Sequence, residues 1–278
     1  MDYYAVIGNP IWHTKSPLIH QLFAHQTNKK IRYEPILVDL NNLPQALNDF
    51  EAQNGKGLNI TAPFKREAFN LVDTVTERAA LSHTVNTIKF NSDGTRHGDN
   101  TDGIGLIRDL TINQSLTLKN KQILLLGAGG AIHAIIHALL AQNPAEIIIT
   151  NRTLATAEAL AKKLPPSAPI KVQPLTNLSV CDPYDLIING TTATQLTLPP
   201  NILNKQTHCY DLSYHQTPFL EWVQTQNPAN CINGLGMLIE QAAEAYYFWH
   251  KIRPDTQTVL SSLCTRYRDF RPIEEISR

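Results

Sequence analysis

Four polar clusters near the start of the chain contain residue types that could do chemistry. They occupy residues 9–17, 59–65, 85–87 and 98–103. Each cluster brings hydroxyl, amide, ammonium or carboxylate groups to the end of an expected strand or the start of an expected helix. Hydroxyls and amides both donate and accept hydrogen bonds, which suits a small polyhydroxylated substrate. A lysine beside an aspartate in these clusters would combine a proton donor with the group that orients it.

A glycine-rich turn later in the chain is the second candidate site. The sequence GAGGA at residues 127–131 follows an apolar strand and precedes an expected helix. Gly127 permits a tight turn, Gly129 leaves room for a pyrophosphate, and the free amides of the helix start would face that phosphate. Ile132 stands where the common GxGxxG pattern has Gly or Ala. Strand, turn, helix and second strand in this order predict a dinucleotide site, with a plain structural turn as the alternative.

The residues after the second strand of this unit favour NADP over NAD. NAD-binding folds usually place Asp or Glu there, to bind the ribose 2′-hydroxyl. This chain has Asn151, Arg152 and Thr153 instead, with no carboxylate. Arg152 could bind a 2′-phosphate through two hydrogen bonds. A solvated arginine at a helix start is the alternative interpretation.

The elements that must position these residues alternate between strands and helices. In the first half we expect strands at 3–7, 33–40, 57–61 and 85–90, and helices from 17, over 43–53, from 63 and from 102. After a polar stretch at 111–121 we expect strands at 122–126, 146–150, 170–172, 186–189 and 208–212, with helices at 132–142 and 154–164. This alternation predicts an α/β protein whose second sheet is parallel and covered on both faces. The helices expected at 236–251 and 255–269 could cap that sheet or return to the first domain.

Composition and charge limit the partners. The formal net charge is zero, so no global field attracts nucleic acid or an anionic membrane. The N-terminal residues do not read as a signal peptide, and no apolar run is long enough to span a bilayer. His133 and His137 have a spacing that can bind zinc, but no third ligand is evident and we expect no metal. We therefore expect a soluble cytoplasmic protein that binds small molecules.

Together these motifs resemble the shikimate 5-dehydrogenase family. The four polar clusters, GAGGA, the Asn-Arg-Thr sequence at 151–153, Tyr-Asp at 210–211 and GLGML at 234–238 match nearly the whole chain, in order. The resemblance implies NADPH-dependent reduction of 3-dehydroshikimate to shikimate, on the route to aromatic compounds. It implies an open α/β substrate-binding domain at 1–102, with C-terminal helices at 237–278 returning to it. A Rossmann-type NADP-binding domain would occupy 103–236.

The resemblance also implies roles for individual residues. Lys65 would be the catalytic acid/base, with Asp102 as its partner and a further contact to substrate. Thr14 and Ser16 would hold the substrate carboxylate. The pocket would be completed by Thr61, Asn86, Tyr214 and Gln241. NADP would contact Gly127, Ala128, Gly129, Gly130, Ala131, Asn151, Arg152, Thr153, Leu212 and Gly234, with Glu77 as a further cofactor residue.

Elementary chemistry supports the role implied for Lys65. Hydride delivery to a ketone builds negative charge on the oxygen, which a nearby ammonium group stabilises and protonates. A helix N-terminus does not favour a cation, so a lysine there needs a reason other than helix stability.

The sequence departs from the family pattern at several positions. Thr14 replaces a usual Ser, Ala62 replaces a usual Val, and His83 introduces an imidazole near the expected pocket. Thr156 occupies the place of a second Arg found in many relatives that use NADP. Losing that cation should weaken the discrimination between NADP and NAD without abolishing it, because Arg152 remains.

Two other functions are compatible with these residues. A quinate/shikimate dehydrogenase using NAD is the nearer alternative, and the missing carboxylate after the second strand counts against it. A non-catalytic dinucleotide-binding module is the more distant one, and the presence of both Lys65 and Asp102 counts against it. The sequence is compatible with either a monomer or a homodimer.

Overall fold

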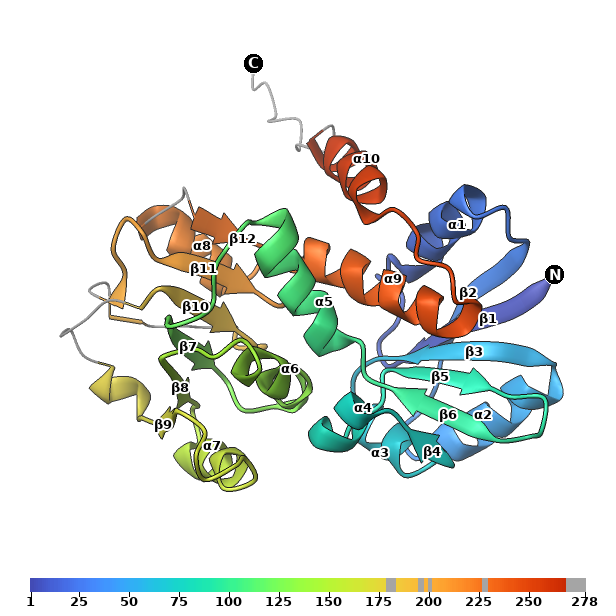
Figure 1. Cartoon of the computed structure of the whole chain (residues 1–278), viewed down its shortest axis with the longest axis horizontal. Coiled ribbons are helices and arrows are strands. Elements are labelled where there is room, and N and C mark those ends of the chain that lie inside the picture. Colours follow the sequence, from blue (N-terminus) through green and yellow to red (C-terminus); the bar gives the residue numbers. More distant parts are fainter. Residues whose placement is uncertain (179–183, 195–197, 200–201, 227–229, 269–278) are drawn as a thin grey trace, which may run out of the picture.

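Two six-stranded sheets with flanking helices make up the molecule (Figure 1). The computed structural model describes residues 1–178, 184–194, 198–199, 202–226 and 230–268 of the 278 in the chain. The last ten residues of the predicted C-terminal segment 237–278 therefore lie outside the described part. Among the described residues, no helix has both the length and the apolar character that crossing a membrane requires.

The N-terminal sheet is mixed, with strand order β2-β1-β3-β5-β6-β4. Its strands are β1 (Asp2–Gly8), β2 (Ile31–Leu37), β3 (Gly55–Ile60), β4 (Thr74–Val75), β5 (Thr87–Phe90) and β6 (Arg96–Asp99). Strand β1 runs parallel to β2 and β3, whereas β5 is antiparallel to β3 and β6. The helices of this half are α1 (Ser16–Gln26), α2 (Leu43–Ala52), α3 (Lys65–Phe69) and α4 (Glu77–Ser82). The sequence analysis missed β4, β6 and α4.

The second sheet is entirely parallel, as predicted. Its strands are β7 (Gln122–Leu126), β8 (Glu146–Thr150), β9 (Ile170–Val172), β10 (Leu186–Asn189), β11 (His208–Asp211) and β12 (Cys231–Ile232). Their order, β12-β11-β10-β7-β8-β9, reverses between β7 and β10. This is the doubly wound order of dinucleotide-binding folds, in which ligands bind at the reversal point. The sequence analysis missed β12.

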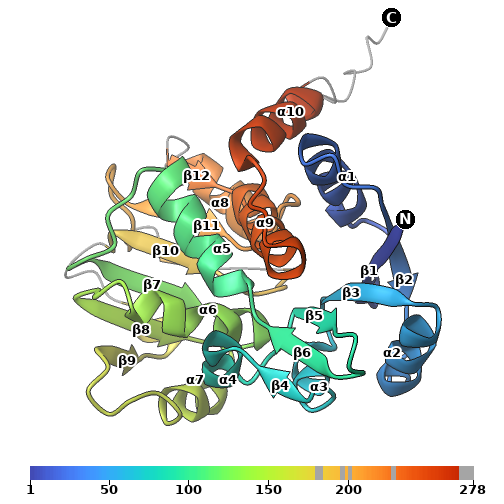
Figure 2. The ribbon, with the colours of Figure 1, turned by 45° about the vertical axis from the view of Figure 1, so that its right-hand side comes forward.

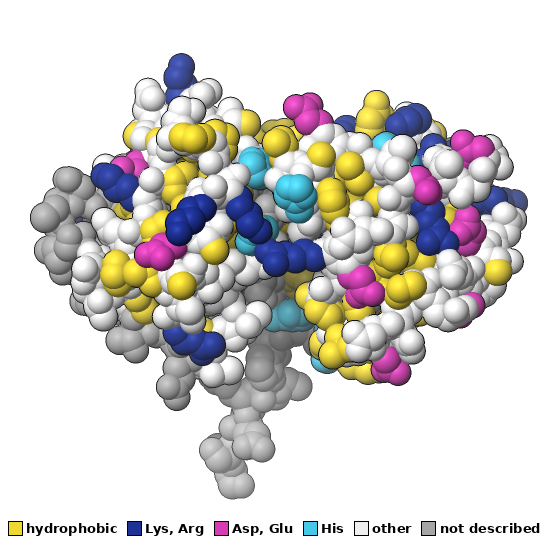
Figure 3. All heavy atoms as spheres, turned by 90° about the horizontal axis from the view of Figure 1, so that it is seen from below, with side chains coloured by type: hydrophobic (Ala, Val, Ile, Leu, Met, Phe, Trp, Pro, Cys, Tyr) yellow, Lys and Arg dark blue, Asp and Glu magenta, His cyan; other side chains and the backbone are white. Residues whose placement is uncertain are grey.

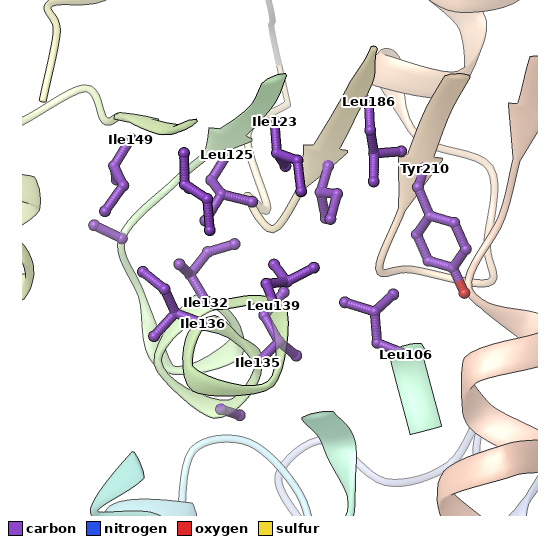
Figure 4. Close-up of a cluster of buried hydrophobic side chains, with 14 of the residues drawn as sticks. Leu106, Ile123, Leu125, Ile132, Ile135, Ile136, Leu139, Ile149, Leu186 and Tyr210 are labelled. Atoms are coloured by element: carbon purple, nitrogen blue, oxygen red, sulfur yellow. The ribbon is translucent and has the colours of Figure 1, made fainter. Parts of the chain in front are cut away.

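The helices of the second half cover both faces of this sheet, as predicted. They are α6 (Gly130–Leu140), α7 (Leu154–Ala161) and α8 (Pro218–Gln226), and a short 3-10 turn spans Leu175–Asn177. In β7, Ile123 and Leu125 face α6 (Figure 4), whereas Leu124 and Leu126 belong to the cluster beneath α8. Because neighbouring residues of a strand point to opposite faces, one continuous apolar run serves both layers. Helix α8 was not predicted.

Helices α5 and α9 lie side by side between the two sheets (Figure 2). Helix α5 (Asp102–Arg108) continues as a π-helical turn over Asp109–Asn113, and α9 (Leu235–His250) is followed by α10 (Thr256–Arg268). Helix α9 packs on the first sheet, where Trp249 Nε1 donates a hydrogen bond of 2.9 Å to the Ile88 carbonyl. Because α5 contacts both α6 and α9, the division at residue 102 stays a prediction.

Candidate active site

A cavity of about 430 Å³ lies between the two halves of the molecule. It is lined by residues from the N-terminal sheet, from the loops that follow β11 and β12, and from α9. All eight residues predicted for catalysis and substrate binding line it: Thr14, Ser16, Thr61, Lys65, Asn86, Asp102, Tyr214 and Gln241. The structure thus brings together side chains that are up to 227 positions apart, since 241 − 14 = 227.

Lys65 and Asp102 form an ion pair in this cavity. Lys65 Nζ lies 2.6 Å from Asp102 Oδ2, and the side chains are 23% and 9% exposed. Each is the first residue of its helix, α3 or α5, so the backbone fixes where each side chain starts. Buried Phe64 anchors the start of α3 in the core of the first sheet. The partly exposed ammonium group can therefore reach a ligand while the carboxylate holds it.

Asn86 fixes the other oxygen of Asp102. Its Nδ2 donates to Asp102 Oδ1 at 2.8 Å and to Thr101 Oγ1 at 3.0 Å, while its Oδ1 accepts from the Thr101 backbone amide at 2.8 Å. The backbone amide of Asp102 donates to Asn100 Oδ1 at 3.0 Å. Both carboxylate oxygens and the local backbone are thus held, which limits the orientations open to Asp102.

Gln241 joins this network from α9. Thr101 Oγ1 donates to Gln241 Oε1 at 3.2 Å. The close approach of the helices depends on Gly105 of α5, because a Cβ there would lie 2.6 Å from Gln241 Cβ. Thr101 and Gly105 were not predicted as site residues. Thr101 lies inside the polar cluster 98–103, but the need for glycine at 105 arises only from the packing of α5 on α9.

The end of the cavity next to α1 contains hydroxyls, and one cation, Lys15, lies beside it. Thr14 Oγ1 lies 3.2 Å from Ser16 Oγ and accepts from the Ser16 amide. Tyr214 OH donates to the His13 carbonyl at 3.2 Å, and Lys15 Nζ lies 5.5 Å from the centre of the Tyr214 ring. Burial lowers the pKa of Lys15 and raises that of Tyr214. An ammonium group and two hydroxyls at this end suit a carboxylate ligand.

His215 and Met237 are among the lining residues that were not selected as site residues from the sequence. His215 follows Tyr214 and lies edge-on to His13, with ring centres 6.2 Å apart. Burial, then Lys15 and His13, lower the pKa of His215. Met237 lines the cavity beside Gly234. Its place inside the GLGML sequence was the only available signal, whereas nothing in the sequence singled out His215.

The glycine turn at 127–131 is open on the side where a ligand would approach. Gly127 has a φ of +106°, which favours glycine, and a Cβ at Gly129 or Gly130 would meet nothing within 4 Å. Ala128 is buried under the turn, and Ala131 lines the cavity. The unfilled space and the start of α6 fit a pyrophosphate group.

Apart from Glu77, the other predicted cofactor residues lie in two places. Leu212 and Gly234 line the cavity, and a Cβ at Gly234 would lie 2.4 Å from the Leu212 carbonyl oxygen. Arg152 is exposed after β8, where Asn151 Nδ2 donates to the Thr153 carbonyl at 2.9 Å. These three residues lie on the same sheet edge as the glycine turn, because β7 and β8 are parallel neighbours.

Glu77 and His83 do not line this cavity either. Glu77 is exposed at the start of α4 and does not line the cavity, so its cofactor role stays a prediction. His83, which we expected near the substrate pocket, lies instead in a second cavity that also contains His133 and His137. Within the described residues no group of three or more His, Cys, Asp or Glu side chains is arranged to hold a metal ion.

The fold and the site define a class of protein. A doubly wound sheet with a glycine turn at its reversal point, facing a Lys–Asp pair across a cavity, is the arrangement of a dinucleotide-dependent dehydrogenase. Comparison with known proteins identifies the family. The chain belongs to the shikimate dehydrogenase family.

Three family profiles match successive parts of the chain. They are the shikimate dehydrogenase substrate binding domain at residues 6–88, shikimate / quinate 5-dehydrogenase at 110–213, and the shikimate 5′-dehydrogenase C-terminal domain at 234–264. Shikimate dehydrogenase (NADP(+)) of Cellvibrio japonicus is 45% identical, over 94% of this chain and 96% of that protein.

Solved structures agree with this assignment. An enzyme from Pseudomonas putida is 42% identical with a TM-score of 0.87, covering 95% of this chain and 98% of its own. Shikimate 5-dehydrogenase from Thermus thermophilus, solved with NADP(H) and shikimate, is 28% identical with a TM-score of 0.84, covering 95% and 99%. The two-domain α/β fold predicted from the sequence is thereby confirmed.

Proposed function

We propose that this chain is an NADP-dependent shikimate dehydrogenase, which interconverts 3-dehydroshikimate and shikimate. Relatives of that name match it over nearly its whole length, and one solved relative holds NADP(H) and shikimate together. The observation that carries the proposal is the ion pair between Lys65 and Asp102. It lies in a cavity that also reaches the glycine turn at Ala131.

Lys65 is the proposed acid/base. Bound NADPH would supply a hydride to the carbonyl carbon of the substrate. Lys65 Nζ would donate a proton to the carbonyl oxygen, where negative charge develops, and would take that proton back in the direction of oxidation. Asp102 holds Nζ through Oδ2 and is proposed to accept a hydrogen bond from a substrate hydroxyl.

The remaining polar lining residues are proposed to orient the substrate. Thr14 and Ser16 offer hydroxyls to the substrate carboxylate, with the Lys15 ammonium group close to Tyr214 at the same end. We propose that the ring hydroxyls of the substrate form hydrogen bonds with four other lining residues, Thr61, Asn86, Tyr214 and Gln241. Each of these groups can donate or accept, so the set can match alternating hydroxyls on a small ring.

The proposed cofactor residues are those of the glycine turn, those that follow β8, and two residues of the cavity wall. Gly129 and Gly130 leave the backbone open to a pyrophosphate, and Arg152 presents an exposed cation after β8 for a 2′-phosphate. Gly127, Ala128, Ala131, Asn151, Thr153, Leu212 and Gly234 complete the proposed set. Glu77 stays a weaker member because it lies on α4 of the N-terminal half, outside the cavity and outside the sheet that carries the glycine turn.

A steady-state comparison tests the proposal. Oxidation of shikimate and of quinate should be measured with NADP and with NAD, using the full chain. We expect shikimate with NADP to give the highest kcat/KM. A higher value for quinate with NAD would establish the catabolic alternative, and no turnover with any pair would support the non-catalytic module.

Three predictions from the sequence accompany this proposal. They are a cytoplasmic location, the absence of a nucleic-acid partner, and the division into domains at 1–102 with 237–278 and at 103–236. The chain is compatible with a monomer or a homodimer, and gel filtration combined with light scattering distinguishes the two.

A further inference from the structure

A second cavity, of about 570 Å³, lies between the two halves of the molecule and away from the candidate active site. Its wall combines residues of α3 and α4 with residues of α6 and α7. Its charged and titratable lining residues are Arg66, His83, His133, His137 and Lys163. Viewed from below, Lys, Arg and His side chains gather over this junction (Figure 3).

Among the residues that the structure describes, no carboxylate lines this cavity. Neither Arg66 nor Lys163 forms an ion pair within the described part of the chain. Three of the four helices that line the cavity contain an acidic residue, and Glu67 of α3, Glu77 of α4 and Glu158 of α7 are all absent from the lining. The chain as a whole has zero formal net charge, but the lining of this cavity contains Arg66 and Lys163 and, within the described ranges, no acidic residue, so the cavity is locally positive.

The contact between Arg66 and His133 indicates that the Arg66 guanidinium has no anionic acceptor among the described residues. Arg66 Nη2 lies 3.0 Å from His133 Nε2. Because a guanidinium group can only donate, Nε2 must accept, which requires a neutral ring. The surroundings enforce that state, since burial and then Arg66, Lys163, His137 and His83 lower the pKa of His133 to about 4. A neutral imidazole is thus serving as the acceptor for a cation.

The pKa of His137, one helical turn further along α6, is also lowered. Burial and the neighbouring His83 lower its pKa, which only the Leu81 carbonyl opposes. His83 reaches the cavity from the residue after α4, where it has a φ of +50°. Apolar side chains of Phe69, Leu81, Ile136, Leu160 and Leu164 form most of the remaining wall, and the side-chain amide of Asn70 adds a neutral donor. The Ser82 hydroxyl also lines the cavity but donates to the backbone carbonyls of Ala79 and Thr84.

We infer that this cavity is a binding site for a small multivalent oxyanion, separate from the sites for substrate and dinucleotide. An oxyanion accepts from Arg66 and Lys163 at once and can also accept from protonated histidines, which the present contacts cannot offer. Because the cations come from both halves of the chain, a bound anion would join α3 and α4 to α6 and α7.

Titration of the NADP⁺-saturated full chain with sulfate tests the inference. Sulfate stays dianionic across the titration range, so any pH dependence belongs to the protein, and saturation with NADP⁺ blocks the phosphate sites of the dinucleotide. Calorimetry should show one sulfate per chain. Binding should be about tenfold tighter at about pH 5.5 than at about pH 8, since the anion favours protonated histidines. A parallel titration with citrate distinguishes carboxylate from sulfate-like anions.

Matched variants locate the site. Lys163→Gln and His137→Gln should each weaken sulfate binding by about tenfold. Lys162→Gln, which removes a neighbouring lysine that does not line the cavity, should leave it unchanged. Sulfate should also raise the pKa values of His133 and His137 in the unsubstituted chain, measured by NMR of the ring protons. The inference is wrong if sulfate fails to saturate, releases NADP⁺, binds equally to all three variants, or leaves those pKa values unmoved.

Discussion

Ile132 occupies the space that a side chain at residue 190 would need. A Cβ built on Gly190 lies 2.6 Å from Ile132 Cδ1 and 2.9 Å from its Cγ1. Gly190 directly follows β10, and Ile132 lies in the first turn of α6, fully buried among the core residues of the second sheet (Figure 4). The small residue that dinucleotide-binding turns usually have for close helix–strand packing is therefore supplied by the neighbouring strand end instead.

This relationship predicts a strong coupling between the two positions. Gly190→Ala should lower the free energy of unfolding by about 1–3 kcal/mol, because the core must shift to admit the methyl group. Ile132→Ala should lower it by about 2–5 kcal/mol through the cavity that it leaves. In the double variant the loss should be smaller than the sum of the two, since Ile132→Ala removes the atoms that obstruct residue 190. Urea unfolding of all four chains measures the coupling.

Gly130→Ala is the control for this experiment. A Cβ at Gly130 meets nothing within 4 Å, so this variant should unfold at the same urea concentration as the original chain. Strictly additive losses at positions 132 and 190 would contradict the packing argument.

Lys65 gives the second prediction. Lys65→Ala should lower kcat/KM for shikimate oxidation by about 10²- to 10⁴-fold, the range typical of a lost general acid/base. NADP⁺ affinity, measured by fluorescence quenching, should stay the same because the glycine turn is untouched. Asp102→Asn should also lower kcat, since Lys65 Nζ loses the carboxylate 2.6 Å away. Lys119→Ala, an exposed lysine elsewhere, is the control. Undiminished turnover by Lys65→Ala would remove Lys65 from the mechanism.

The third prediction concerns the choice of dinucleotide. Arg152→Gln should raise the KM for NADP by about 10- to 100-fold, the cost of losing hydrogen bonds from a cation to a phosphate. The KM for NAD should hardly change, because NAD has no 2′-phosphate, so the same variant contains its own control. Thr156→Arg should lower the KM for NADP, since Thr156 is exposed in the first turn of α7 and its backbone amide already bonds to Thr153. Equal effects on both dinucleotides would place Arg152 away from the phosphate.

The fourth prediction follows from the packing of α5 on α9. Gly105→Ala places a methyl group 2.6 Å from Gln241 Cβ and 2.8 Å from the Gln241 backbone nitrogen. Backbone cannot yield as a flexible side chain can, so α9 should move and displace Gln241 from Thr101. We expect a higher KM for shikimate with an unchanged KM for NADP, measured by steady-state kinetics. A higher KM for NADP with an unchanged KM for shikimate would show that the displacement of α9 affects the cofactor site instead.

Local signals in the sequence predicted the second sheet well. Its strands are apolar runs bounded by turns, and the glycine turn lies between a strand and a helix, so neighbouring residues carry most of the information. The same approach failed for β6, because Arg96–Asp99 contains no apolar residue. This strand is defined by its pairing with β5, which precedes it across a short turn, and with β4 on its other side.

The residues of the candidate site also fall into two groups, those that local sequence signals predicted and those that depend on the packing of distant elements. Lys65 and Asp102 stand at helix starts within recognisable motifs, which identified both as candidates, whereas their contact depends on how the fold places α3 beside α5. The requirement for Gly105 beside Gln241, the place of His215 in the cavity and the second, cationic cavity depend on how distant helices pack. No pattern of neighbouring residues encodes such contacts, so a single sequence did not reveal them.

The last prediction concerns stability against acid and rests on His20. This side chain of α1 is fully buried, stacks on Tyr33 with ring centres 4.3 Å apart, and has no hydrogen-bond partner for either nitrogen within the described residues. Burial, with a further contribution from His250, lowers its pKa from 6.5 to about 3, and an interaction with the Asn59 side chain opposes this shift only in part. The unfolded chain therefore binds a proton at His20 more readily than the folded chain does. The stability linked to this group is fully present above about pH 6.5 and is lost as the pH falls towards about 3.

His20→Phe should make this loss smaller, because a phenyl ring keeps the stacking on Tyr33 and cannot titrate. Between about pH 6 and pH 4 the free energy of unfolding should fall less steeply in the variant, by up to about 1.4 kcal/mol per pH unit. Burial raises the pKa of Asp109 and Asp211, which acts in the opposite direction but equally in both chains. His25→Phe, an exposed histidine on the same helix, should leave the slope unchanged. Identical slopes for His20→Phe and the original chain, from urea unfolding at each pH, would show that His20 does not control acid stability.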